Sequence, residues 1–182
     1  MTKTQPLFGG ALSVNLPNTI VDASDVRQIP DNQEVFMNNF DQTMIVEILE
    51  YVQEPDEQAL KTHFYDITQT GDEGTGIEIL NAEKVESYSM TQCSGVYYIS
   101  GKSHVAKFKE DARNEVETHI AMFRLPQFTT DILINFTSSC LINPESSSYK
   151  QVDAAGMSQR WTIEDFTRAV SSLTLIDAGL FG

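Results

Sequence analysis

Basic residues, cysteines and long apolar runs are scarce in this sequence. Its 182 residues include 12 Lys and Arg against 26 Asp and Glu, a formal net charge of −14 at pH 7. A surface this acidic repels phosphate backbones and anionic lipids, so the charge argues against nucleic acid and membrane partners. No apolar run reaches the roughly twenty residues that span a bilayer. The same charge suits a basic protein partner without naming one.

Only two cysteines occur, Cys93 and Cys140, and their spacing matches no metal or redox pair. We interpret them as reduced structural thiols in a reducing compartment. Residues 1–6 are polar and contain no apolar signal region, which argues against secretion.

The sequence also lacks catalytic motifs. It contains no Gly-x-Ser-x-Gly elbow, no His-Glu-x-x-His and no phosphate-binding loop. The three histidines, His63, His104 and His119, stand far apart; Phe64 rather than His63 is the expected core residue, and His119 is either exposed or packed. We therefore predict no enzymatic activity and no cofactor, with a hydrolase assembled from distant residues as the alternative.

One segment resembles a calcium-binding loop but lacks a required ligand. Asp66 and Gly71 stand where such a loop places Asp and Gly, but its twelfth position, which requires a bidentate Glu, is Ile77. A solvated acidic loop over 68–76 is the preferred interpretation, and no metal site is predicted.

Hydropathy patterns predict several strands and about three helices, hence an α+β fold in a single domain over residues 1–182. A short helix follows Asp22, a longer one covers 56–67, and the last covers 162–173 with Thr162 as its cap. Its apolar stripe is Ile163, Phe166, Val170 and Leu173. We expect strands at 12–16, from Glu34 onward, and at 44–52, 77–80, 95–100, 105–108, 116–125 and 131–137. Turns are expected at Gly9-Gly10, 30–32 and Gly101-Lys102, and a hairpin connection at 126–128. The Ser-rich segment 140–157 is expected to be irregular.

A group of charged and polar residues between positions 22 and 34 is the candidate binding site. Structural roles are open for two members, because Asp22 can cap a helix and Asp31 can form an Asx turn. Gln33 and Glu34 have weaker structural reasons at the entry to a strand. The candidate residues are Asp22, Asp25, Arg27, Asp31, Gln33 and Glu34.

Around this group the sequence resembles the Ran guanine-nucleotide-release factors. The family's Gly-Gly strand, Ile-Asp-x-Ser-x-Leu/Val-Arg segment and Val-Pro-Asp-x-Gln-Glu-Val motif recur here in order, with Ile29 for the usual valine. Segments 71–112 and 140–157 do not resemble the family. The matching segments are 7–11, 20–27, 29–35, 45–50, 124–128 with Asp131, and 175–181.

The resemblance implies a twisted, mainly antiparallel sheet flanked by helices, similar to the PsbP protein of photosystem II. It also implies Ran as partner, nucleotide release as activity, a role in nuclear import, and residence in nucleus and cytoplasm. In the family an acidic face surrounds the Pro-Asp-x-Gln-Glu motif, which corresponds to Asp31, Gln33 and Glu34, with Asp22 and Asp25 beside them. A Ran-binding adaptor without exchange activity is the alternative, and nothing in the sequence calls for more than a monomer.

Overall fold

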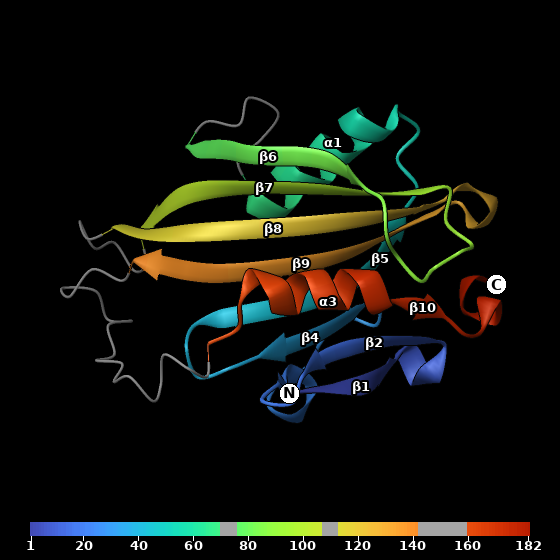
Figure 1. Ribbon diagram of the computed structural model, residues 1–182, viewed down its shortest axis with the longest axis horizontal. Coiled ribbons are helices and arrows are strands. Elements are labelled where there is room, and N and C mark those ends of the chain that lie inside the picture. The colour runs from blue at the N-terminus through green and yellow to red at the C-terminus, as the bar shows by residue number, and fades with distance from the viewer. Residues whose placement is uncertain (70–75, 107–112, 142–159) are drawn as a thin grey trace.

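Two antiparallel sheets form the framework of the protein in a computed structural model, which describes residues 1–69, 76–106, 113–141 and 160–182 (Figure 1). The larger sheet has seven strands and the smaller has three. In spatial order the large sheet contains β3 (Val21–Asp22), β4 (Gln33–Met37), β5 (Gln42–Glu50), β9 (Thr130–Leu141), β8 (Arg113–Leu125), β7 (Gly95–Ala106) and β6 (Ile77–Val85). The small sheet contains β1 (Thr2–Leu7), β2 (Leu12–Pro17) and β10 (Thr174–Leu175).

Helix α1 (Asp56–Thr68) covers one face of the large sheet (Figure 1). It starts after Pro55, with Asp56 and Glu57 in the first turn, where carboxylates favour the helix dipole. Its buried side chains Leu60 and Phe64 pack on residues of β7, β8 and β9 whose side chains point to this face. The expected helix over 56–67 and the core position of Phe64 are confirmed.

Helix α3 (Ile163–Ser172) and the small sheet cover the opposite face. Thr162 and Asp165 form a reciprocal capping box at its start, as the predicted cap requires. Phe166, Val170 and Leu173 are buried, whereas Ile163 is 42% exposed. Ile163 thus shares the apolar side of the helix with Phe166 and Val170, as predicted, but does not enter the core.

Hairpin β8–β9 runs through the 3₁₀ turn η3 (Pro126–Phe128) and confirms the predicted connection. The predicted turn at Gly101-Lys102 is wrong, because β7 continues through both residues. A Cβ atom on Gly101 would lie 2.8 Å from the Glu78 carbonyl oxygen and from the Phe64 ring. Glycine is therefore needed at this position for close packing of α1 on the sheet rather than for a turn.

Several expectations concern residues outside the described part of the chain. Most of the expected loop at 68–76, which includes the rejected calcium loop, lies there, as does all of 142–157. Strand β9 extends to Leu141, and β7 includes residues 105–106 of the strand expected at 105–108.

A buried ion pair joins the middle of the sheet to the chain segment between β5 and α1. Arg124 and Asp131 face each other across β8 and β9, and both side chains are fully buried. The Arg124 Nε atom lies 3.3 Å from Asp131 Oδ1, while its Nη atoms donate to the carbonyl oxygens of Val52 (2.6 Å) and Glu54 (3.1 Å). The guanidinium also stacks 3.9 Å from the centroid of Tyr51.

Asp131 completes this buried ion-pair network through its second oxygen. Oδ2 accepts a hydrogen bond from the Val52 backbone N–H (3.1 Å) and lies 2.9 Å from Nε2 of the buried His63. At the start of α1, the Tyr97 hydroxyl donates a hydrogen bond to Asp56. Burial of the hydroxyl and its hydrogen bond to Asp56 raise the pKa of Tyr97 to about 12. The network therefore fixes the entry of α1 onto the sheet.

Candidate partner-binding site

The six candidate residues lie along one edge of the large sheet, on β3, the 3₁₀ turn η2 (Ala23–Asp25), β4 and the segment between η2 and β4. Strand β3 pairs with β4, and η2 packs against β4. In Figure 1, β4 lies beside the small sheet, on the opposite side of the large sheet from β6. We call the part of this edge that contains Asp22, Asp25, Arg27, Asp31, Gln33 and Glu34 the acidic face. Gln33 and Glu34 are adjacent on β4, so their side chains point to opposite sides of the sheet.

Asp22 has the capping role that its position suggests. Its Oδ1 accepts a hydrogen bond from the Ser24 backbone N–H at 2.9 Å, which starts η2. The side chain is half-buried, whereas Asp25, at the end of the same turn, is exposed.

Asp31 lies in the turn before β4, but it does not form the Asx turn that was its structural alternative. A backbone hydrogen bond from Gln33 N–H to the Pro30 oxygen (3.0 Å) closes the turn instead. The Asp31 side chain is exposed and, like those of Asp25 and Arg27, has no hydrogen bond or ion pair with the rest of the described chain. These three side chains are available to a partner.

Gln33 and Glu34 were expected to have weaker structural reasons than Asp22 and Asp31, but both make structural hydrogen bonds. Gln33 Nε2 donates to Glu47 Oε1 across β4 and β5 at 2.6 Å. Glu34 Oε1 accepts a hydrogen bond from the Phe8 backbone N–H, also at 2.6 Å. Phe8 has a φ of 49° and precedes Gly9 at 67°, so Glu34 supports the left-handed turn of the small sheet.

The acidic face thus contains two kinds of residue. Asp25, Arg27 and Asp31 are exposed, whereas Asp22, Gln33 and Glu34 are half-buried and bonded to their surroundings. Within the described residues, none of the six side chains bonds to another. The structure brings them to one edge of the sheet without linking them into a catalytic arrangement.

Exposed apolar side chains on the same edge were missed in the sequence. Val26, directly after η2, is 70% exposed. Val21 and Met37, which face each other across β3 and β4, are also exposed. Val26 stands between Asp25 and Arg27 in the sequence, and an apolar residue in such a polar run was the available signal. Apolar side chains edged by polar ones are typical of protein interfaces.

Outside this edge, His119 lies among aromatic side chains. Tyr98 OH lies 2.7 Å from His119 Nδ1, and His119 Nε2 lies 3.1 Å from Glu117 Oε1. Burial lowers the pKa of His119 and outweighs the opposing effect of Glu117. A neutral ring with its proton on Nε2 satisfies both contacts. The imidazole stacks between Tyr98 and Phe136, so His119 is a packed residue.

The described residues contain no group of three or more His, Cys, Asp or Glu side chains placed to hold a metal ion. Cys93 is buried, and burial raises the pKa of its thiol, which disfavours the nucleophilic thiolate. In the same part of the chain, no helix is both apolar and long enough to cross a bilayer.

Fold and site together define an α+β protein whose candidate site is an exposed sheet edge rather than an enclosed pocket. Residues 5–139 match the family of Ran-interacting Mog1 proteins, and this chain belongs to that family. The resemblance seen in the sequence motifs is thereby confirmed.

Curated relatives match nearly the whole chain. The "Ran guanine nucleotide release factor" of Danio rerio is 44% identical and covers 98% of this chain and 100% of its own. The human protein of the same name is 36% identical, covering 100% and 97%. The "Nuclear import protein mog1" of Schizosaccharomyces pombe is 31% identical, covering 96% and 98%.

A solved structure supports the fold. The crystal structure of the Saccharomyces cerevisiae Ran-binding protein Mog1p superposes with a TM-score of 0.72 over 100% of this chain and 99% of its own. Because the two sequences are 24% identical, we use this likeness for the fold alone. The expected α+β architecture, an antiparallel sheet flanked by helices, is confirmed.

Proposed function

We propose that this protein binds the small GTPase Ran and promotes release of its guanine nucleotide, in support of nuclear protein import. The observation that carries the proposal is the 44% identity, over almost the full length of both chains, to a protein named as a Ran guanine nucleotide release factor. The family is named for an interaction rather than a reaction, and in our proposal the protein catalyses no covalent chemistry.

The acidic face is the surface that we assign to Ran. Asp25, Arg27 and Asp31 make the polar contacts in this proposal, because each is exposed and has no partner in the described chain. Val26 supplies an apolar contact between them. Asp22, Gln33 and Glu34 shape the surface through their own hydrogen bonds and contribute negative potential.

The chemistry of a GTPase suggests how an acidic face releases nucleotide. Such proteins hold the phosphates with a lysine, backbone N–H groups and Mg²⁺. A carboxylate that pairs with this lysine, or displaces Mg²⁺, replaces phosphate contacts in the nucleotide-free state. Asp31 suits this role better than Glu34, because one Glu34 oxygen already accepts the Phe8 N–H bond.

The remaining parts of the proposal follow from the partner and the charge. Binding to Ran places the protein in nucleus and cytoplasm, where an import factor acts. The net charge of −14 favours a basic protein surface over nucleic acid or lipid, and we propose that the protein acts as a monomer.

Release of a fluorescent guanine nucleotide from purified Ran tests the proposal. We expect the protein to accelerate release, and the double variant Asp25→Asn with Asp31→Asn to lose most of the acceleration. Asp66→Asn is the matched control, because Asp66 is an exposed aspartate of α1 on another surface. A complex without acceleration would favour the adaptor alternative, and no complex would refute Ran binding.

A further inference from the structure

Strand β6 forms the edge of the large sheet opposite the acidic face. All nine of its residues are exposed or half-buried. No other strand of the described chain pairs with its outer edge, so backbone N–H and C=O groups there remain available for hydrogen bonding.

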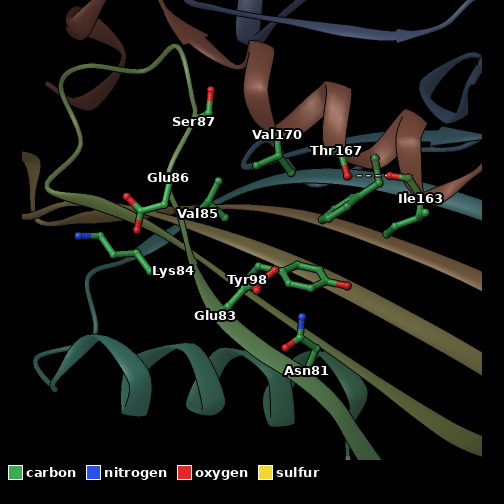
Figure 2. A pocket seen from close by; sticks show the side chains of 11 residues that line it. Asn81, Glu83, Lys84, Val85, Glu86, Ser87, Tyr98, Ile163, Thr167 and Val170 are labelled. Atoms are coloured by element: carbon green, nitrogen blue, oxygen red, sulfur yellow. Dashed lines mark hydrogen bonds between the residues drawn. The ribbon is translucent and has the colours of Figure 1, made fainter.

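A groove runs between this strand and α3 (Figure 2). Its volume is about 480 Å³, and Tyr98 of β7 lies between the two elements. The groove exists because α3 packs on β2 and β9 and leaves the β6–β7 side of the same face open. Its apolar lining consists of Val85, Tyr98, Ile163, Phe166 and Val170.

Negative charge lines the β6 side of the groove. Glu83 and Glu86 have neither a hydrogen bond nor an ion pair with other described residues. Lys84 also lines the groove, and Figure 2 shows its side chain and that of Glu86 pointing to the same side, away from the Tyr98 ring. A ligand that places a cation beside Tyr98 therefore gains the Glu83 carboxylate, which has no bonded partner among the described residues.

The regular part of β6 adjoins this groove. Its pairing with β7 is interrupted between Ile79 and Asn81 and is regular from Asn81 to Val85. Glu83 and Val85 are two positions apart, so their side chains point to the same side of β6. That side faces the groove, because Glu83 is paired with Tyr98 of β7. An added strand can therefore pair along Asn81–Val85 while every second side chain of that strand enters the groove.

We propose that this groove and the adjoining edge bind an extended, basic segment of a partner protein. The segment adds a strand to β6, inserts an apolar side chain against Tyr98 and Phe166, and places Lys or Arg against Glu83. A second copy of this chain fits less well, because edge-to-edge pairing brings the same carboxylates together in a protein of charge −14. The site is separate from the acidic face, and the inference does not depend on Ran binding.

Peptide binding to the isolated protein tests this inference. The probe is a pool of short peptides, about eight residues long, in which Lys or Arg alternates with Val, Ile, Leu or Phe. Peptides enriched from the pool are measured by fluorescence polarisation, beside copies N-methylated at alternate residues. We expect methylation to weaken binding more than about tenfold, because it removes the strand hydrogen bonds.

Protein variants separate the groove from general attraction between opposite charges. The variant Glu83→Gln should weaken binding about twofold to fivefold, whereas exposed Glu50→Gln, which removes the same charge, leaves it unchanged. Ile163→Ser at the groove should weaken binding, whereas Ile176→Ser, a more exposed apolar residue elsewhere, should not.

Three results would overturn the inference. The first is no saturable binding, and the second is equal loss of affinity in the Glu50 and Glu83 variants. The third is a concentration-dependent dimer that the Glu83 variant strengthens, because a second copy would then occupy the edge.

Discussion

Two regions of this protein use aspartate in opposite ways. On the acidic face, Asp31 is exposed and has no bonded partner in the described chain. In the buried ion-pair network, Asp131 is fully enclosed and contacts Arg124, Val52 and His63. Removing Asp31 should therefore change what the protein binds, whereas removing Asp131 should change whether it folds.

The largest expected effect is loss of stability in Asp131→Ala. The substitution removes the buried carboxylate partner of Arg124 and leaves only the partly exposed Asp56, whose Oδ1 lies 3.4 Å from an Arg124 Nη atom. Breaking a buried pair typically costs about 3–5 kcal/mol. Urea denaturation measures the free energy of unfolding, with Asp66→Asn as an exposed control. A loss below about 1 kcal/mol would show that the network contributes little to stability.

The next effect is weaker Ran binding in the double variant Asp25→Asn with Asp31→Asn. We expect affinity to fall about tenfold, mainly through slower association and with a weaker dependence on salt. The free energy of unfolding should stay within about 0.5 kcal/mol, because both side chains are exposed. Equal binding by variant and wild type would remove these carboxylates from the interface.

Glu34 belongs to the acidic face but also has a structural hydrogen bond, and two substitutions separate these roles. Glu34→Ala removes the acceptor for Phe8 N–H and should cost about 1 kcal/mol of stability. Glu34→Gln keeps an acceptor oxygen and should retain most of that stability while losing the charge. If both variants weaken Ran binding equally without destabilising the protein, the Phe8 contact is not structural.

The smallest effect is a pH dependence of stability through His119. Burial lowers its pKa in the folded protein, so below about pH 6.5 the unfolded chain binds a proton that the folded chain does not. Stability is complete above this pH and falls as pH drops toward the folded pKa, by at most about 1.4 kcal/mol per pH unit. The free energy of unfolding, measured between pH 7.5 and 5.5, should change less with pH in His119→Gln than in the wild type. The same change in both proteins would contradict this assignment.

The sequence predicted the elements that depend on local patterns. Helix α3 has a capping box and an apolar spacing, and the β8–β9 hairpin has two strands rich in β-branched and aromatic residues joined through Pro126. Gly101 was misread because a glycine that allows close packing has the same local signature as one in a turn. The choice between them depends on Phe64, which is distant in the sequence.

The sequence predicted where the candidate site lies but not the structural contacts of its residues. The family motif located the acidic face, yet Glu34 contacts Phe8, 26 positions away, through a fold that local sequence does not specify. Arg124 and Asp131 were noted only as part of a motif. Their burial depends on the strand register and on the segment that begins at Tyr51.

The most direct test of the central claim compares affinity for nucleotide-free Ran with affinity for GTP-loaded Ran. Coupling between two ligands is reciprocal, so a protein that weakens nucleotide binding must itself bind the nucleotide-free form more tightly by the same factor. We predict tighter binding to nucleotide-free Ran, with a smaller difference for the Asp25/Asp31 double variant. Equal affinities for the two forms would contradict nucleotide release and leave Ran binding alone.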